Sequence, residues 1–263
     1  MELKELSVFY DKKLALFPLS TTIKEGCLTA IIGKNGSGKS TLLRAIASLH
    51  KKQMGSVWID DQNIFSLSAK ERAKKITLLT QNPQISQEMT VEQLVALGRY
   101  PHQKGRFLTP KDKEVIEKSL YHVNMLQYKS QLITDLSGGQ RQRVWLALAL
   151  AQETPFLLLD EPTTYLDLEG QLEILQLLKY LQKELNKTMI IVHHDINQVA
   201  RFCDEILVMN EGKLLAQGSV KKVMTKECLK QVYHLQMDIQ EDENYGCPQI
   251  TFYDLLESDD EKN

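Results

Sequence analysis

Short apolar runs that end in polar residues recur along the chain and predict the buried strands of a parallel sheet. Three of these runs are residues 28–32, 156–159 and 189–192. The first leads into a glycine-rich turn, the second into Asp160-Glu161 and the third into His193-His194-Asp195. Because ligands bind outside the carboxyl ends of strands in an open parallel sheet, the three runs predict one shared site in an α/β domain.

The segments around these runs predict helices and a hairpin. Apolar residues recur at helical spacing from Leu42 to Leu49, directly after the glycine-rich turn, and again over residues 172–185. The turn Asn210-Glu211-Gly212 separates two apolar stretches, which is typical of a hairpin. Residues 90–135 show helical spacing and few strand signals, so we expect an inserted helical subdomain there.

Composition and charge exclude several classes of protein. The chain has 263 residues, 43% hydrophobic and 25% charged, with a net charge of −2, so its overall charge recruits neither nucleic acid nor lipid. The longest apolar run, residues 144–151, is far shorter than the about 20 residues of a membrane-spanning helix. Residues 1–13 lack the apolar stretch and cleavage site of a secretory signal, so we expect a cytosolic location.

The four cysteines are too far apart for a zinc knuckle or a redox dithiol, and we interpret them as reduced packing residues. They are Cys27, Cys203, Cys228 and Cys247.

The glycine-rich turn fits the phosphate-loop pattern G-x-x-x-x-G-K-[ST], with a strand before it and a helix after it. Glycines let successive backbone N–H groups curl around an anion, and the helix N-terminus adds partial positive charge. We expect Lys39 to reach the β- and γ-phosphates, and Ser40 and Asp160 to hold Mg²⁺. A plain connecting turn would leave the lysine and the serine unexplained. The residues expected to bind the nucleotide here are Gly33, Asn35, Gly36, Ser37, Gly38, Lys39, Ser40 and Thr41.

A second glycine turn, Leu136-Ser137-Gly138-Gly139-Gln140, also opens a helix. Taken alone, it is better explained as an ordinary serine N-cap. Its place a short segment upstream of the strand that ends in Asp160-Glu161 changes that interpretation, because the whole pattern resembles the ATP-binding cassette (ABC) ATPases, whose signature is this pentapeptide. The resemblance runs from Leu3 to Gly218. The motifs that carry it are the phosphate loop, Gln81, the signature at 136–140, Asp160-Glu161, Leu166-Asp167 and His194.

The resemblance implies a fold and its divisions. It implies an α/β P-loop NTPase core of the ABC type, with a mixed or parallel sheet, an N-terminal antiparallel β part and an inserted helical subdomain. Residues 1–83 and 136–218 would form a RecA-like core with the β part. Residues 84–135 would form the helical subdomain, and residues 219–263 a C-terminal extension with a polar tail.

The resemblance also implies catalytic roles for matching residues. Glu161 would be the general base that polarises water, and His194 would contact the γ-phosphate. Gln81 would sense Mg²⁺ and the attacking water, so that the expected Mg²⁺ site comprises Ser40, Gln81 and Asp160. The expected catalytic residues are Glu161, His194, Gln81 and Lys39. A metal site at His193-His194 is disfavoured because adjacent residues on an extended strand point to opposite faces.

Further roles concern the base of the nucleotide and a second copy of the chain. Tyr10 would stack on adenine, with Phe9 as a neighbouring alternative and a core tyrosine as another. Asp167 would communicate between paired subunits. The signature turn would complete the ATP site of a partner in a head-to-tail dimer, through Ser137, Gly138, Gly139 and Gln140.

ABC ATPases include transporter motors, soluble translation or assembly factors and DNA-maintenance ATPases. DNA-maintenance ATPases insert long coiled coils between phosphate loop and signature, for which the segment from Thr41 to Leu136 is too short. Translation factors usually carry two cassettes, whereas each motif occurs once here. A transporter motor is therefore favoured over a soluble non-transport ATPase.

A second resemblance points to a branch of importers. Residues 98–102 (GRYPH), 161–167 (EPTTYLD) and 194–198 (HDINQ) resemble the ATPases that drive import of iron-siderophores, haem or cobalamin. The alternative is a zinc or manganese importer, where a His-His-Asp run is also familiar. Either implies ATP and Mg²⁺, a membrane permease docked around residues 84–102, and an extracytoplasmic substrate-binding protein. It also implies no nucleic acid and a peripheral location at the cytoplasmic face of the membrane.

Overall fold

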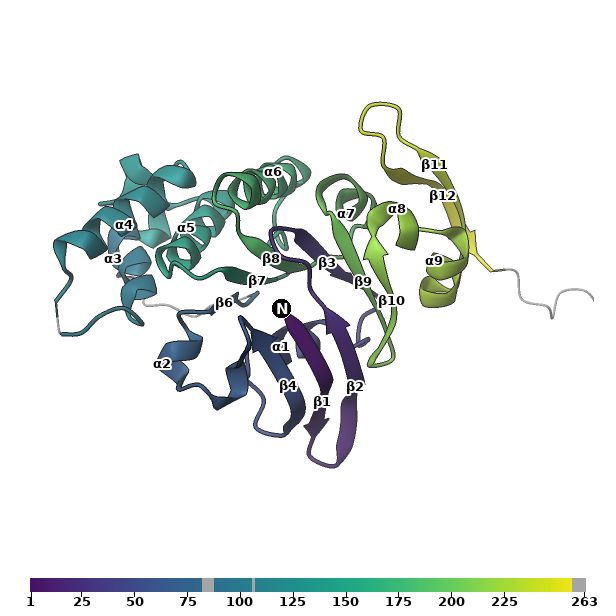
Figure 1. The fold of residues 1–263 in the computed structure, drawn as a ribbon. Coiled ribbons are helices and arrows are strands. Elements are labelled where there is room, and N and C mark those ends of the chain that lie inside the picture. Colours follow the sequence, from purple (N-terminus) through teal and green to yellow (C-terminus); the bar gives the residue numbers. More distant parts are fainter. Residues whose placement is uncertain (82–87, 106, 257–263) are drawn as a thin grey trace, which may run out of the picture.

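The computed structural model describes residues 1–81, 88–105 and 107–256. A six-stranded sheet forms its centre, with the strands in the order β10-β9-β3-β8-β7-β6 (Figure 1). Its strands are β3 (Leu28–Ile32), β6 (Ile76–Leu79), β7 (Phe156–Asp160), β8 (Thr188–Val192), β9 (Glu205–Asn210) and β10 (Lys213–Ser219). All pair in parallel except β10, which is antiparallel to β9. Every residue of β3, β7 and β8 is buried, which explains their continuous apolar runs.

The register of the parallel ladder decides which residues leave the sheet together. Leu79 of β6 pairs with Leu159 of β7, so Gln81 and Glu161 each follow a paired leucine by two residues. β7 and β8 pair up to their last residues, so His193-His194 leaves the sheet next to Glu161. The expected gathering of polar residues at one edge therefore follows from the pairing.

A second, antiparallel sheet has the order β2-β1-β4-β5. Its strands are β1 (Glu2–Tyr10), β2 (Lys13–Thr22), β4 (Gln53–Ile59) and β5 (Gln62–Asn63). Helix α1 (Lys39–Ile46) contacts both β1 and the central strands β7 and β8, and its Leu42, Leu43 and Ile46 lie in the apolar core between the two sheets. The start of α1 is thereby fixed beside the tip of β1.

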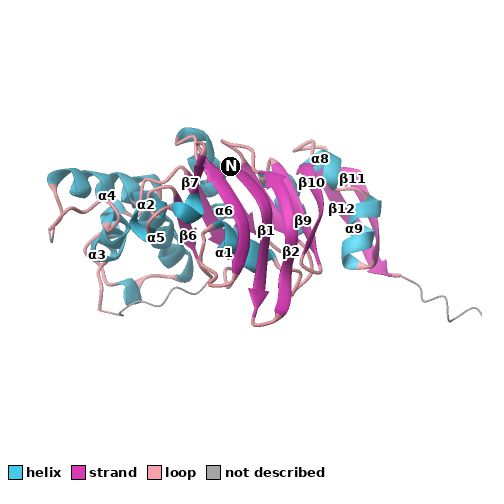
Figure 2. Cartoon of the chain, turned by 60° about the horizontal axis from the view of Figure 1, so that its bottom comes forward, coloured by secondary structure: helices cyan, strands magenta, loops and turns pink. Residues whose placement is uncertain are grey.

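Helices cluster at one end of the molecule, between β6 and β7 in the chain (Figure 2). They are α3 (Val91–Ala96), η2 (Leu97–Arg99), α4 (Pro110–His122), η3 (Leu126–Tyr128), η4 (Ile133–Asp135) and α5 (Gly138–Ala151). α3, α4 and α5 each begin with a capping box, in which the N-cap hydroxyl and the third helical residue bond each other's backbone amide. The remaining helices before the extension are η1 (Ile64–Ser66), α2 (Ala69–Arg72), α6 (Leu168–Glu184) and α7 (Ile196–Phe202).

The C-terminal extension forms a unit of its own shape at the opposite end (Figure 2). It consists of α8 (Val220–Val223), α9 (Lys226–Tyr233), β11 (Leu235–Glu241) and β12 (Pro248–Leu255), with the last two paired as an antiparallel hairpin. The sequence analysis did not predict this hairpin. Its hairpin strands are largely exposed, so they lack the continuous apolar run that marks β3, β7 and β8.

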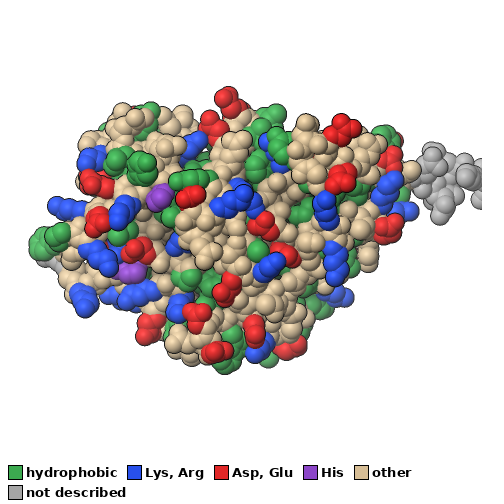
Figure 3. Space-filling view, turned by 45° about the horizontal axis from the view of Figure 1, so that its top comes forward, with side chains coloured by type: hydrophobic (Ala, Val, Ile, Leu, Met, Phe, Trp, Pro, Cys, Tyr) green, Lys and Arg blue, Asp and Glu red, His purple; other side chains and the backbone are tan. Residues whose placement is uncertain are grey.

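The predicted α/β class, with a mostly parallel core sheet and an antiparallel N-terminal part, is confirmed by this topology. The division into the ranges 1–83, 84–135, 136–218 and 219–263 stays a prediction. Acidic and basic side chains are interspersed over the face shown in Figure 3, in keeping with the net charge of −2. Within the described ranges, no helix combines the length and apolar character needed to span a membrane.

His193, directly after β8, is a buried histidine held by two hydrogen bonds. Its Nδ1 accepts from the backbone N–H of Asp195 at 3.0 Å, so its Nε2 carries the proton and donates to Thr163 Oγ1 at 3.2 Å. Burial is the largest cause that lowers the pKa of His193, to about 4, because the charged ring loses solvation. The folded protein therefore holds this ring neutral.

This pKa predicts a loss of stability on acidification. At pH values between about 6.5 and 4, His193 is protonated in the unfolded chain but not in the folded one, so this group's contribution falls by about 3 kcal/mol as the pH drops. We expect His193→Asn, whose amide oxygen can still accept from the Asp195 N–H, to remove this part of the pH dependence. Urea unfolding of both proteins at pH 7 and pH 4.5 measures it; equal pH dependence would contradict the prediction.

Candidate functional site

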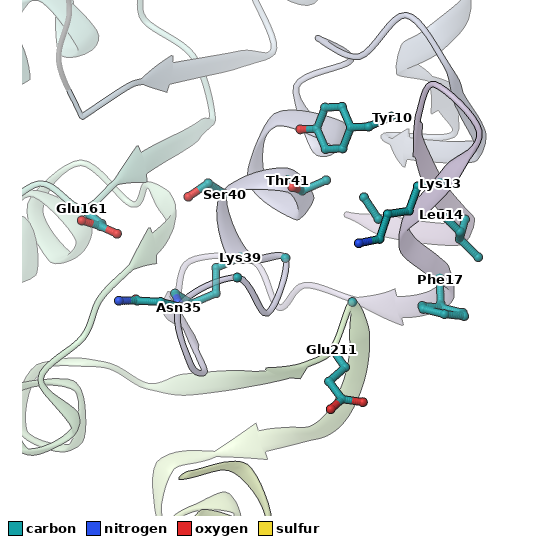
Figure 4. Close-up of a pocket in the computed structure, with 14 residues that line it drawn as sticks. Tyr10, Lys13, Leu14, Phe17, Asn35, Lys39, Ser40, Thr41, Glu161 and Glu211 are labelled. Carbon is teal, nitrogen blue, oxygen red and sulfur yellow. The ribbon is translucent and has the colours of Figure 1, made fainter.

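A cavity of about 820 Å³ opens over the phosphate loop and is lined by residues of that loop, of β1 and β2, and of the turns after β7 and β9 (Figure 4). The loop and the start of α1 form its floor, while Tyr10 and Glu161 lie on opposite sides of it. The lining residues are Tyr10, Lys13, Leu14, Ala15, Phe17, Asn35, Gly36, Gly38, Lys39, Ser40, Thr41, Glu161, Glu211 and Gly212. Six of the predicted nucleotide-binding residues of the loop therefore face one space.

The phosphate loop takes its shape because all three of its glycines adopt conformations that other residues rarely adopt. Gly33 has φ 147°, and a Cβ there would lie 2.2 Å from the carbonyl oxygen of Met209. Gly38, the N-cap of α1, has φ 98°. The β9–β10 turn braces the loop from outside, since the Gly212 N–H donates to the Ser37 carbonyl at 3.0 Å. The chain after β3 is thus bent into a cradle of backbone amides.

Lys39 supplies a cation inside this cradle. Its ammonium donates to the carbonyl oxygens of Gly33 at 2.8 Å and Lys34 at 2.9 Å. Burial lowers the pKa of Lys39, and the nearby carboxylates of Glu161 and Asp160 oppose that shift. A buried ammonium held against backbone carbonyls is matched in charge to a phosphate.

Ser40 and Asp160 meet at the end of β7, as predicted for a Mg²⁺ site. The Ser40 hydroxyl donates to Asp160 Oδ1 at 2.8 Å, and the Arg44 guanidinium lies 3.6 Å from the other carboxylate oxygen. A hydroxyl and a carboxylate are oxygen ligands of the kind that Mg²⁺ prefers, so this pair fits the ion. Gln81, the third residue of the expected Mg²⁺ site, donates to Glu161, and its role as a ligand stays a prediction.

Glu161 is the meeting point of the predicted catalytic residues. Its carboxylate accepts from Gln81 Nε2 at 2.8 Å and from Thr164 Oγ1 at 3.1 Å, and it is hydrogen-bonded to His194 Nε2. The backbone of Glu161 itself is left-handed, with φ 54°, a strained conformation of the kind found at functional sites. Three separate segments thus hold one carboxylate at the edge of the cavity.

The two adjacent histidines have different surroundings. His193 is 4% exposed and bonded within the chain, whereas the side chain of His194 is 45% exposed and reaches Glu161. The expectation that they point apart agrees with this geometry.

Tyr10, at the end of β1, lines the cavity, and its neighbour Phe9 does not. The Tyr10 ring is 49% exposed and is held at its side by His50, edge to face, with ring centroids 5.5 Å apart. His50 is tied in turn to the Thr41 carbonyl at 3.2 Å, and burial lowers its pKa. An exposed aromatic ring at the mouth of the phosphate loop is suited to stacking on a base.

The signature turn is built as a capped helix start. Ser137 Oγ accepts from the Gln140 N–H at 3.2 Å, and Gln140 Oε1 accepts from the Ser137 N–H at 2.9 Å. The structure therefore contains the serine N-cap. Gly138 and Gly139 follow at the open end of α5, where an added Cβ would meet only Leu166, and only next to Gly138. Residues 136–140, all described, do not line the cavity.

The motif at residues 98–102 divides into an inner and an outer part. Gly98 packs so closely on α5 that a Cβ would lie 2.3 Å from the Leu148 carbonyl oxygen. Arg99, 2% exposed, donates to the Ala151 carbonyl at 2.7 Å and pairs with Asp112 and Glu153. His102 Nε2 lies 2.8 Å from the carbonyl oxygen of Gln152. Tyr100 is 73% exposed, so the motif caps the end of α5 and presents one aromatic ring.

Three residues of the site were missed by the sequence analysis. Thr164 bonds Glu161, Thr163 holds His193, and His50 supports Tyr10. The run Thr163-Thr164 next to Asp160-Glu161 was a usable signal, because hydroxyls beside a carboxylate offer donors. His50 carries no local signal, since only the packing of α1 brings it to β1.

Comparisons with known proteins show the family of the chain. The family described as ABC transporter matches residues 16–164. The iron(3+)-hydroxamate import ATP-binding protein FhuC of Bacillus subtilis (strain 168) is 40% identical over 259 residues, 98% of this chain and 96% of the relative. The ferric enterobactin transport ATP-binding protein FepC of Escherichia coli (strain K12) is 41% identical over 248 residues, 94% of this chain and 92% of the relative.

Solved structures share the fold. An inward-facing metal-chelate type ABC transporter superposes with a TM-score of 0.82 at 28% identity, over 97% of this chain and 96% of that chain. A dimeric ATP-binding cassette in a post-hydrolysis state, bound to ADP and Pi, superposes with a TM-score of 0.71 at 32% identity, over 83% of this chain and 97% of that chain. From its motifs, its fold and these likenesses, the chain belongs to the family of ABC transporter ATP-binding proteins.

Proposed function

We propose that this chain is the Mg²⁺-dependent ATPase subunit of a membrane importer for a metal chelate, in the class of iron-siderophore, haem or cobalamin. The observation that carries the proposal is the Glu161 carboxylate, held by Gln81, Thr164 and His194 at the edge of the phosphate-loop cavity. The relatives named as hydroxamate and enterobactin transport proteins support the chelate class.

In this proposal the nucleotide lies across the cavity, with its base at Tyr10 and its phosphates in the loop. Backbone amides of residues 33–41 and the Lys39 ammonium bind the β- and γ-phosphates. Ser40 and Asp160 hold Mg²⁺, whose charge neutralises phosphate oxygens when it is bound.

Glu161 is the general base. Its carboxylate orients a water molecule for in-line attack on the γ-phosphorus and takes up a proton as the bond to the ADP oxygen breaks. The amide of Gln81 and the hydroxyl of Thr164 hold the carboxylate by donating to one of its oxygens. His194, bonded to the other oxygen and exposed, is placed to contact the γ-phosphate.

A second copy of the chain completes each site. The signature residues Ser137, Gly138, Gly139 and Gln140 do not line the cavity of their own chain, and Gly138 and Gly139 leave their helix end open. A head-to-tail dimer with two-fold symmetry would apply this helix start to the γ-phosphate of the partner's ATP. The dimeric cassette among the similar structures supports this arrangement.

A permease and an extracytoplasmic binding protein are the other partners of the proposal. Of the expected docking segment 84–102, residues 84–87 lie outside the described residues. In the described part, Leu97 is 50% and Tyr100 is 73% exposed, which suits contact with a membrane partner. In this proposal the chain lies peripherally at the cytoplasmic face of the membrane, where it docks on the permease. The relatives named above support a chelate importer over the alternative, a zinc or manganese importer, because both are named for hydroxamate or enterobactin transport.

The first prediction concerns nucleotide binding. Lys39→Ala removes the buried ammonium of the loop, and we expect MgATP affinity to fall by about 10- to 100-fold, as for the loss of charge-assisted hydrogen bonds. Titration with a fluorescent ATP analogue measures it. Lys118→Ala, an exposed lysine on α4, is the matched control and should bind normally. Equal affinity of both variants would contradict the role of Lys39.

The second prediction separates binding from chemistry. Glu161→Gln keeps the shape of the side chain but removes the base, so we expect hydrolysis to slow by about 10²- to 10⁴-fold with ATP binding retained. Single-turnover hydrolysis and nucleotide binding are measured on the same preparation. Glu117→Gln, an exposed carboxylate of α4, serves as control. Turnover of Glu161→Gln at the rate of the control would show that another group activates water.

The third prediction tests the dimer by mixing. Lys39→Ala and Gly138→Asp chains, both also carrying Glu161→Gln, should each fail to dimerise with ATP. In a mixed head-to-tail dimer, one site carries both lesions and the other carries none. We expect labelled ATP to be retained in the dimer peak on size-exclusion chromatography only after mixing. A site formed within one chain predicts no retained nucleotide above that of either variant alone.

A further inference from the structure

Helix α7 joins the candidate site to the C-terminal hairpin, and its Asn197 bonds the hairpin backbone. The Asn197 amide nitrogen donates to the Ile250 carbonyl at 3.2 Å, and its oxygen accepts from the Ile250 N–H at 2.8 Å. Ile250 lies on β12, and both of its backbone groups point away from β11 toward α7. The asparagine thus pairs with the open edge of the hairpin as a neighbouring strand would.

Asn197 stands three residues after His194 at the start of this helix. Asp195 caps α7 by accepting from the Gln198 N–H at 3.0 Å. His194 lies directly before this cap, and the Asp195 N–H donates to His193 Nδ1, so the chain is held on both sides of His194 and its position depends on that of α7. These bonds give Asp195 and Asn197 of the motif at 194–198 their structural roles, since the first caps α7 and the second bonds β12.

The next residue of the motif extends the connection to a second loop of the site. Gln198 Nε2 donates to Gln171 Oε1 at 3.0 Å, and Gln171 Nε2 donates to the Leu166 carbonyl at 3.0 Å. Leu166 precedes Asp167, the residue expected to communicate between subunits. The start of α7 therefore fixes two segments near Glu161: the one that contains His194 and the one that contains Leu166.

Two further contacts seat the extension on the core. The Arg201 guanidinium lies over the Tyr245 ring, 3.8 Å from its centroid, and donates to its hydroxyl at 2.6 Å. Tyr233 of α9 packs against the main apolar core, and burial raises the pKa of its phenol to about 12. The extension thus contacts both α7 and the apolar core.

We infer that Asn197 is a positioning residue, through which the C-terminal hairpin holds α7 and thereby sets His194 for ATP hydrolysis. The inference rests on the proposed function, because it acts through the role of His194. Asparagine suits this position because its amide offers one donor and one acceptor, matching the N–H and C=O of a strand edge. Hydrolysis, and not nucleotide binding, is then the step that depends on the hairpin.

The test is a double-mutant cycle between Asn197 and His194 on the full chain. Asn197→Ala should lower kcat for ATP by about tenfold to 100-fold, as for displaced catalytic groups, and leave the ATP Kd within about twofold. In a chain that already carries His194→Ala, the same Asn197→Ala change should cause no further loss. A merely structural role would lower the active fraction equally in both backgrounds.

Three controls keep the outcomes separate. Asn244→Ala, an exposed residue of the hairpin turn, should keep normal kcat. Ile250→Pro removes the backbone N–H that donates to Asn197, and it replaces Asn197→Ala if that variant does not fold. We expect it to lower kcat in the chain with His194 and to cause no further loss in the His194→Ala chain. Normal hydrolysis by His194→Ala would overturn the proposed site and this inference with it. A loss in His194→Ala but none in Asn197→Ala, or an equal loss in both backgrounds, would overturn the inference alone.

Discussion

The parallel pairing of β6, β7 and β8 is the constraint on which the candidate site depends. Because Leu79 pairs with Leu159, the chain delivers Gln81 and Glu161 to the sheet edge at the same level, and the paired ends of β7 and β8 bring His194 beside them. A slip by one residue would turn every buried side chain of the strand to the other face. The apolar core that fixes the register therefore also assembles the candidate catalytic groups, although none of its buried residues lines the cavity.

In the proposed head-to-tail dimer, the site within one chain is one half of a larger site. The phosphate loop, the proposed general base Glu161 and the ring of Tyr10 share a cavity, whereas the signature turn caps its own helix outside that cavity. The capping box and the proposed nucleotide contact use different groups, since Ser137 and Gln140 bond each other while the glycine amides stay open. Stability of the monomer and completion of a partner's site therefore need not compete at this helix start.

Sequence patterns predicted the parts of the fold whose residues are buried on all sides. β3, β7 and β8 show as apolar runs because both faces of the sheet are covered, and the phosphate loop shows because its glycines have no substitute. The hairpin β11–β12 does not show, since its strands are exposed and packed at single points such as Ile250. Contacts such as Thr164 to Glu161 depend on the left-handed backbone at Glu161, which no pattern of residue types encodes.

The close packing of Gly98 against α5 ties the two ends of this helix to different parts of the molecule. Residues 98–102 contact its last turn through the Gly98 backbone and through hydrogen bonds from Arg99 and His102, while the signature lies at its first turn. Its fourteen residues make the helix about 21 Å long, so a tilt of about 10° about its last turn displaces its first turn by about 4 Å. That displacement exceeds the length of a hydrogen bond, so in the proposed dimer a rotation of this size at residues 98–102 would be enough to make or break the contact of Ser137 with the partner's nucleotide.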